Sequence, residues 1–256
     1  EIGSNAFSGC SSLTDFIIPD SIKEIENELF YGCSSITEII IPPLVVSIGD
    51  SSFKRCSLLK QVDIPDCTET ILHSAFKRCT NLDNIKLPSS LVTIDDTAFK
   101  CCSSLTKITI PSHVSEIGYS AFNGCSNLSE IYFDDVSTLK SMGYRVFQNC
   151  SLLKKISIPS SLTEIQSMSF NGCSSLEEVT FCAPSSINKL GWHAFKCCYS
   201  LKKIELPPLV TEIGWYAFED CKSLTDVLIP NSTTIIGQSA FKGCIRLIEI
   251  SIPDSV

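Results

Sequence analysis

Residues 117–133 read IGYSAFNGCSNLSEIYF, and nearly the same letters return along the whole chain. Phe122 is followed three residues later by Cys125 and six residues later by Leu128, and apolar residues stand nine and eleven positions after it. Eleven units align when this Phe is placed in one column, which holds Phe7, Phe30, Phe53, Phe76, Phe99, Phe122, Phe147, Phe170, Phe195, Phe218 and Phe241. Successive members are separated by a 23-residue step eight times and by a 25-residue step twice.

This fixed period predicts a solenoid, because one 23-residue unit cannot bury its own apolar face and has to stack on its neighbours. The segment L-x-x-I-x-I predicts a short strand with alternate residues inward, and the Pro that follows it in nine of eleven units removes a ladder donor and ends it. Stacked units then form one parallel sheet, and Ala-Phe lies in an irregular or 3₁₀ turn on the opposite side. Phe99 becomes a neighbour of Phe122, and Cys102 a neighbour of Cys125.

Glycine precedes Ala-Phe in several units, where we expect it to permit a tight bend. These residues are Gly118, Gly143, Gly191, Gly214 and Gly237. The two 25-residue units gain their extra residues after the strand, in FDDVSTLKSM and FCAPSSINKL, and both lack the usual Pro. Because each insertion is only two residues long, we expect bulged turns there, although insertions in repeat proteins often form loops on a binding face.

The unit resembles a leucine-rich repeat, and more narrowly the BspA-like class named after treponemal proteins. The resemblance extends from IGSNAFSGCSSLTDFIIP to IGQSAFKGCIRLIEISIP and so covers all eleven units. It implies a leucine-rich-repeat solenoid with a curved parallel β-sheet on the concave side and short irregular, β or 3₁₀ segments on the convex side. We expect a single domain over residues 1–256, uncapped at both ends and therefore a piece of a longer array.

Eleven of the fifteen cysteines stand three residues after a column Phe. Stacked positions lie roughly 4.8 Å apart with parallel Cβ vectors, whereas a disulfide needs Cβ atoms about 3.8 Å apart and turned toward each other. We therefore expect buried free thiols, and bridged or reactive cysteines are the alternative. Cys67, Cys101, Cys182 and Cys197 fall outside the column and are the candidates for oxidation or pairing.

No arrangement of residues indicates an enzyme, a cofactor or a metal site. The three histidines include His193, which lies four residues before Cys197, but no carboxylate stands beside this pair to orient the imidazole. We expect His193 to be a solvated surface residue. The adjacent cysteine pairs do not recur close enough in space to complete a tetrahedral zinc site.

The strand position eight residues after Phe should point out of the sheet, and its charges alternate in sign over six units. These residues are Lys107, Glu130, Lys155, Glu178, Lys203 and Asp226. Opposite charges on neighbouring strands contribute roughly 0.2 to 1 kcal/mol per pair, so we expect this ladder to satisfy itself. Nearer the N-terminus, Ile17 and Ile40 should form an exposed apolar patch with an acidic edge, which is either a contact surface or the seat of a neighbouring domain.

Both tryptophans and two tyrosines share the position three residues before Phe, as Tyr119, Tyr144, Trp192 and Trp215, and Tyr216 adjoins Trp215. Polar residues hold this position in other units, so it cannot be wholly buried. A row of accessible Tyr and Trp is typical of protein-contact hot spots. The alternative is that the rings only pack along the flank of the solenoid.

The net charge of −8 makes nucleic acid an unexpected partner, and no apolar run is long enough to insert in a membrane. The resemblance implies a cell-surface or secreted adhesin or surface antigen that binds extracellular-matrix or host-cell surface proteins. The alternative function is an intracellular scaffold for protein complexes, located in the cytoplasm and consistent with reduced thiols.

Overall fold

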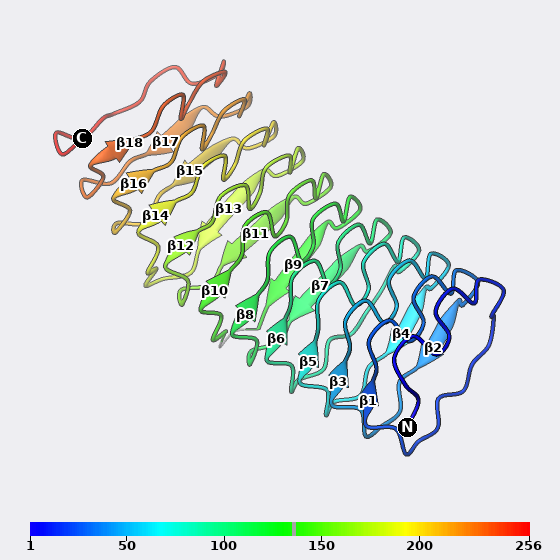
Figure 1. Cartoon of the computed structure of the whole chain (residues 1–256). Helices are drawn as coiled ribbons and strands as arrows, with labels where there is room; N and C mark the ends of the chain where they lie inside the picture. The colour runs from blue at the N-terminus through cyan, green and yellow to red at the C-terminus, as the bar shows by residue number, and fades with distance from the viewer. Residues whose placement is uncertain (135–136) are drawn as a thin grey trace.

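The chain winds into a stack of short coils with its two termini at opposite ends (Figure 1). This computed structural model describes residues 1–134 and 137–256, and that part contains eighteen β-strands and no helix. Every strand pair in it is parallel, and paired residues come from consecutive coils. The predicted parallel solenoid is therefore confirmed.

The first column of strands follows the Leu position of each unit. It consists of β2 (Glu38–Ile40), β4 (Gln61–Asp63), β7 (Lys107–Ile110), β9 (Glu130–Phe133), β11 (Lys155–Ile158), β13 (Glu178–Phe181), β15 (Lys203–Glu205) and β17 (Asp226–Leu228). Exposed and buried residues alternate along each strand, so that Lys107 and Thr109 face solvent while Ile108 and Ile110 enter the core. We call the outer surface of this column the long-strand face.

The long-strand column consists of four separate strand pairs, divided between β4 and β7 and again at the two lengthened units. Strand β9 pairs with β7 and β13 pairs with β11, but neither is hydrogen-bonded to the strand that follows it. The missing Pro has a local consequence, because the free N–H groups of Asp134 and Cys182 donate to Ile110 and Ile158 and extend these two ladders. The second insertion contains a bend at Ala183–Pro184. The bulge expected in the first insertion falls partly on residues 135 and 136, which lie outside the described residues.

A second column of two-residue strands precedes the Phe turns, where we expected irregular, β or 3₁₀ segments. It comprises β1 (Glu24–Ile25), β3 (Ser47–Ile48), β5 (Thr70–Ile71), β6 (Thr93–Ile94), β8 (Glu116–Ile117), β10 (Ser141–Met142), β12 (Glu164–Ile165), β14 (Lys189–Leu190), β16 (Glu212–Ile213) and β18 (Ile235–Ile236). They form a six-stranded and a four-stranded sheet, divided between β10 and β12. Each coil therefore has two sheet positions with the core between them.

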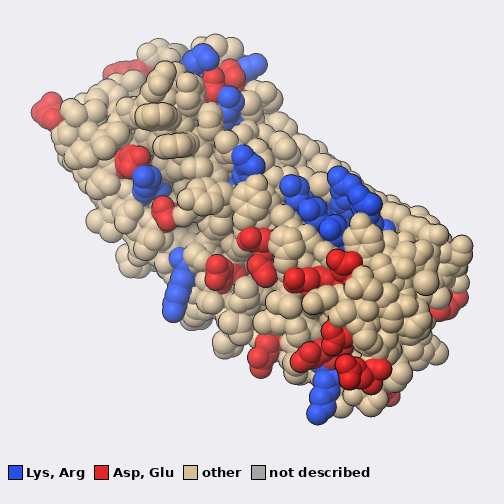
Figure 2. All heavy atoms as spheres, in the orientation of Figure 1, with Lys and Arg blue, Asp and Glu red and all other residues tan. Residues whose placement is uncertain are grey.

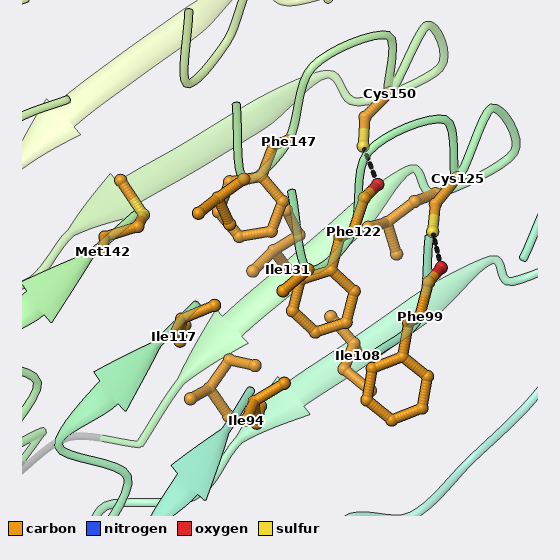
Figure 3. Packing of buried hydrophobic residues seen from close by; sticks show 14 of the residues in the cluster. Ile94, Phe99, Ile108, Ile117, Phe122, Cys125, Ile131, Met142, Phe147 and Cys150 are labelled. Atoms are coloured by element: carbon orange, nitrogen blue, oxygen red, sulfur yellow. Dashed lines mark hydrogen bonds between the residues drawn. The ribbon is translucent and has the colours of Figure 1, made fainter. Parts of the chain in front are cut away.

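The Phe residues form a continuous stack through this core (Figure 3). Successive ring centroids lie 5.2 to 5.7 Å apart, and the ring planes are within 17° of parallel. Phe99 and Phe122, which are fully buried, stack at 5.3 Å and 4°. The backbone enforces this register, because Phe99 N–H donates to Ala121 of the next coil at 2.8 Å. No turn of the part described adopts the 3₁₀ helix that we considered.

The glycines before Ala-Phe serve close approach between coils, and the expectation that they make the bend is wrong. A Cβ on Gly143 would lie 2.6 Å from the backbone nitrogen of Tyr119, and one on Gly118 would lie 2.4 Å from that of Asp96. The left-handed backbone instead occurs two residues before and two residues after each Phe, as at Ser120 (φ 55°) and Gly124 (φ 77°).

The column cysteines are free thiols, and they connect consecutive coils without disulfides. From Cys33 to Cys244 each Sγ donates to the carbonyl oxygen of the Phe one coil earlier, at 3.0 to 3.4 Å. Figure 3 draws two of these bonds, Cys125 to Phe99 and Cys150 to Phe122. Burial raises the pKa of Cys173 to about 12, which keeps its sulfur protonated and able to donate.

Candidate protein-contact surfaces

Aromatic side chains that are partly exposed to solvent occupy the position three residues before Phe, and Tyr216 adjoins them; we call this row the aromatic flank (Tyr119, Tyr144, Trp192, Trp215 and Tyr216). The side chains of Tyr144, Trp192 and Trp215 are 54%, 50% and 49% exposed. Trp192 and Trp215 come from consecutive coils and stack with their ring centroids 5.2 Å apart and their planes 9° from parallel. The stacking already orders both indole rings, so the two tryptophan side chains lose little conformational entropy when a partner packs on them.

The other members of the aromatic flank are less exposed and are held by cations. The Arg145 guanidinium lies 5.8 Å from the centre of the Tyr119 ring and donates from Nη1 to the Tyr119 hydroxyl at 2.8 Å. Tyr216 stacks on the His193 imidazole at 4.9 Å, and the Lys196 ammonium lies 5.9 Å from the Tyr216 ring centre. The aromatic flank is therefore a set of positioned rings with cations beside them.

A groove interrupts the aromatic flank where a small residue, Ser167, occupies the aromatic position. Its volume is about 580 Å³, and Tyr144 and Trp192 line it from the coils before and after Ser167. Two coil spacings separate these rings, roughly 10 Å at the usual distance between strands. Glu164, Gln166, Lys189 and Glu212 add a polar border. In the sequence this groove is marked only by the break in the aromatic column at Ser167, and we did not predict it.

The N-terminal part of the long-strand face carries exposed apolar side chains. Ile17 is 92% exposed and Ile40, in β2, is 72% exposed, and both stand in the outward position ten residues after Phe. Exposed Asp15 and Glu38 precede them by two residues, which gives the acidic edge. This patch has the composition of a contact surface, but it lacks the ring stacking that fixes the aromatic flank.

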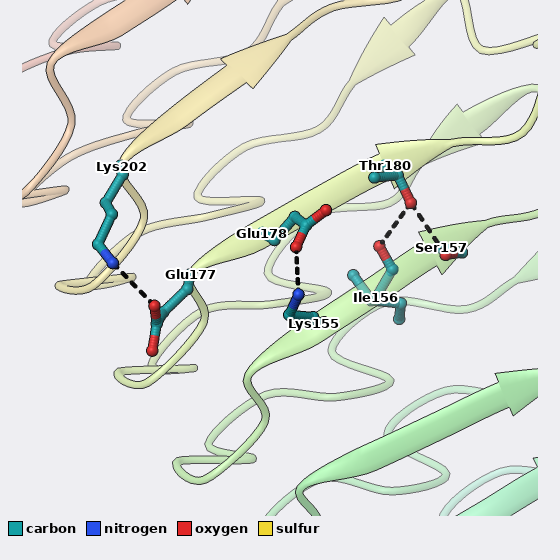
Figure 4. Close-up of polar contacts among 7 residues, drawn as sticks. All are labelled: Lys155, Ile156, Ser157, Glu177, Glu178, Thr180 and Lys202. Atoms are coloured by element: carbon teal, nitrogen blue, oxygen red, sulfur yellow. Dashed lines mark hydrogen bonds and ion pairs between the residues drawn. The ribbon is translucent and has the colours of Figure 1, made fainter.

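The charge ladder of the long-strand face forms only in part, which corrects the sequence-based expectation of a self-satisfied row. Strand register does place Lys107 beside Glu130, Lys155 beside Glu178 and Lys203 beside Asp226. Between two described members of this row, however, the only ion pair is that of Lys155 with Glu178, at 2.7 Å (Figure 4).

Two physical causes limit the ladder. The sheet is broken between β9 and β11 and between β13 and β15, so Glu130 and Glu178 lack a hydrogen-bonded strand on one side. Partners two residues away on the same strand then compete: the Tyr132 hydroxyl donates to Glu130 at 3.0 Å, and Lys203 pairs with Glu205 at 2.8 Å. A groove of about 770 Å³, lined in part by Phe181, Pro184 and Leu228, lies at the second break.

The histidine and the cysteines outside the column do not assemble a reactive site. His193 is half-buried and stacked on Tyr216, and burial lowers its pKa, so the expectation of a solvated surface histidine is wrong. Cys67 and Cys182 are exposed and Cys101 and Cys197 partly exposed, all as free thiols. Within residues 1–134 and 137–256, no group of three or more His, Cys, Asp or Glu side chains could hold a metal ion.

The comparisons with known proteins agree with this geometry. The BspA type leucine rich repeat region matches the chain in overlapping stretches, over residues 1–129, 46–177, 92–223 and 140–256. The chain belongs to this family. No curated protein matches it.

Three solved bacterial structures of this kind are similar to the BspA-type chain. A leucine-rich repeat protein from Bacteroides ovatus is 36% identical with a TM-score of 0.76, and the match covers 96% of this chain and 68% of that one. A leucine rich cell surface protein from Faecalibacterium prausnitzii is 29% identical with a TM-score of 0.50, over 96% and 80% of the two chains. A leucine rich repeat protein from T. pallidum is 28% identical with a TM-score of 0.50, over 70% and 72%.

The family match identifies a leucine-rich-repeat protein, and proteins of this class generally bind other proteins. The matches indicate no catalytic family. The pneumococcal vaccine antigen PcpA, at 22% identity and a TM-score of 0.52, shares the fold. No helix of the described residues is long and apolar enough to cross a lipid bilayer.

Proposed function

We propose that this chain is a protein-binding segment of a cell-surface adhesin or surface antigen that contacts extracellular-matrix or host-cell surface proteins. The observation that carries the proposal is the stacked, half-exposed pair Trp192–Trp215 beside the groove at Ser167. Trp and Tyr are the residues most enriched at contact hot spots, and rigid rings beside a recess offer a place for one large side chain of a partner.

A long array strengthens such a site by repetition. Weak contacts along one solenoid act together once the first is made, because the later ones become intramolecular. The exposed Ile17 and Ile40 provide a second contact area on the long-strand face of the same molecule. The proposed surface location is supported by the description of the Faecalibacterium relative as a cell surface protein.

The test is binding of the purified chain to decellularised extracellular matrix and to intact epithelial cells. The variant Trp192→Ala with Trp215→Ala should weaken binding about 30-fold, since loss of a hot-spot aromatic costs about 2 kcal/mol or more. A matched control is Leu58→Ala with Leu152→Ala, which removes two apolar side chains of similar exposure, 44% and 46%, away from the aromatic flank. Equal binding by the two double variants would refute the role of the aromatic flank.

One observation favours a second function, an intracellular scaffold for protein complexes. All fifteen cysteines are free thiols, and reduced cysteines are usual in a cytosolic protein and unusual in a secreted one. An antibody against this chain distinguishes the two functions. Labelling of intact cells supports the adhesin, and signal that appears only after permeabilisation supports the scaffold.

A further inference from the structure

Five cations occupy three consecutive coils of a chain whose net charge is −8. They stand one and two residues after the column Phe, as Lys54, Arg55, Lys77, Arg78 and Lys100, and we call them the basic strip. In the view of Figure 2 the Lys and Arg spheres gather in one dense group next to a band of Asp and Glu spheres. The strip therefore places five of the twenty basic side chains at two adjacent turn positions of three consecutive coils.

The backbone holds these cations at a regular distance from one another. Arg55 N–H donates to Lys77 at 2.9 Å, and Arg78 N–H donates to Lys100 at 2.8 Å, so the three coils are joined through the strip itself. The Phe rings of the same coils are 5.3 Å apart, which sets the repeat of the charges at about one coil. The basic strip is thus a short row of positive charges with a period of about 5 Å.

The cations of the strip repel one another and have no carboxylate partner among the described residues. None of the five takes part in the ion pairs of residues 1–134 and 137–256. Burial lowers the pKa of Lys77, and the neighbouring charges of Lys54, Lys100 and Arg78 lower it further. The repulsion costs stability, so folding alone does not account for the arrangement.

The backbone gives the two arginines of the strip equivalent positions in consecutive coils. Arg55 and Arg78 have φ values of 66° and 64°, in the left-handed region that favours glycine. The same position holds glycine in five other coils, at Gly9, Gly32, Gly124, Gly172 and Gly243. Cys101, Asn149, Cys197 and Asp220 hold this position in four further coils with the same left-handed backbone, so the conformation belongs to the turn and fixes where the two arginine side chains leave the coil.

We propose that the basic strip binds a sulfated polysaccharide. A linear chain with anionic groups on successive sugars presents negative charges at a spacing of a few ångströms, which matches a row of cations one coil apart. Arginine donates two parallel hydrogen bonds to a planar or tetrahedral oxyanion, and the lysines add point charges beside it. This ligand differs from the protein partner of the aromatic flank, which begins at Tyr119 in the coil after Lys100.

Nucleic acid fits the strip less well than a polysaccharide does. Single-stranded nucleic acid is usually bound by aromatic side chains on which the bases stack. Tyr31, beside the N-terminal end of the strip, is already engaged by Lys54 and Arg55, which lie 5.3 and 5.9 Å from the ring centre. The row of five cations also spans only three coils, roughly 10 Å at the usual strand spacing, whereas protein modules that bind duplex DNA cover roughly 600 Å² or more.

The test measures binding of a heparin decasaccharide at low salt with Arg55→Gly and Arg78→Gly combined. These substitutions install the residue that the same position has in other coils, so the fold is retained and the backbone strain is relieved. At about a fivefold loss for each cation removed, the double variant should bind roughly 25-fold more weakly, and binding should fall steeply with salt.

Two controls separate charge from backbone effects. Lys86→Gln with Lys107→Gln removes two exposed cations from the long-strand face of neighbouring coils, and Asn149→Gly relieves the same left-handed position without a change of charge. Both should bind heparin as the parent chain does. The proposal is overturned if the parent chain does not bind, if the arginine variant binds equally well, or if a DNA oligonucleotide of equal charge binds more tightly than heparin.

Discussion

Truncation of one ring in the middle of the Phe stack should cost far more stability than truncation of a ring at its end. Phe122 is fully buried and stacks on both sides, with Phe99 at 5.3 Å and 4° and with Phe147 at 5.5 Å and 13°. Phe122→Ala removes the whole buried ring and leaves a cavity between two coils, which costs about 3 to 5 kcal/mol. Only neighbouring coils contact one another, so the loss cannot be shared along the stack.

Phe7 is the matched control for this change. Its ring is partly exposed and stacks on one column neighbour only, Phe30, at 5.7 Å. Phe7→Ala should therefore cost about 1 to 2 kcal/mol, the value of a partly buried aromatic side chain. Guanidinium unfolding, followed by far-UV circular dichroism and by the fluorescence of Trp192 and Trp215, measures both variants. Equal costs, or a cost below about 1 kcal/mol for Phe122→Ala, would refute the stack as the main source of stability.

Two further predictions concern close packing and pH. Gly143→Ala should destabilise the chain by about 1 to 3 kcal/mol, because its Cβ would lie 2.6 Å from the Tyr119 backbone, whereas Gly3→Ala meets nothing within 4 Å and should leave the unfolding midpoint unchanged. Ion pairs with Lys196 and then with Lys242 lower the pKa of Glu219 below its ordinary value of 4.5. The ionised carboxylate therefore stabilises the fold above pH 4.5, and this stabilisation is lost as the pH falls through the lower pKa of the folded state. Glu219→Gln should therefore lower the unfolding midpoint at pH 7 and match the parent chain near pH 3, and a midpoint difference that does not depend on pH would contradict the ion-pair role.

The columns of the fold could be predicted from the sequence because a fixed period makes equal positions neighbours in space. Phe99 and Phe122 stand one period apart in the chain, and nothing beyond the stacking of coils is needed to bring their rings together. The off-column cysteines could be separated from the column cysteines by the same argument. The second set of strands was harder to predict, since two residues such as Glu116–Ile117 are too short for a period-2 pattern.

The features that could not be predicted depend on differences between coils. The charge ladder is broken between Glu130 and Lys155 and between Glu178 and Lys203 because two-residue insertions interrupt the sheet there, and the alignment of repeats does not show which strands pair. The groove at Ser167 and the basic strip are each formed by residues from three neighbouring coils, so a single repeat does not show them. The glycine prediction failed because the close approach to the preceding coil, at Gly143, and the left-handed turn, at Arg145, are different positions of the same coil.

The central claim is that equal positions of successive coils stack and leave the column cysteines from Cys33 to Cys244 as buried free thiols, while Cys10 in the first coil is exposed. Alkylation of the native chain, followed by mass spectrometry of each cysteine, tests it most directly. Cys10, Cys67 and Cys182 should react rapidly, Cys101 and Cys197 more slowly, and the ten buried sulfurs not at all. All fifteen should react in guanidinium without a reductant. Rapid native labelling of Cys102 or Cys125, or fewer than fifteen thiols after unfolding, would contradict the claim.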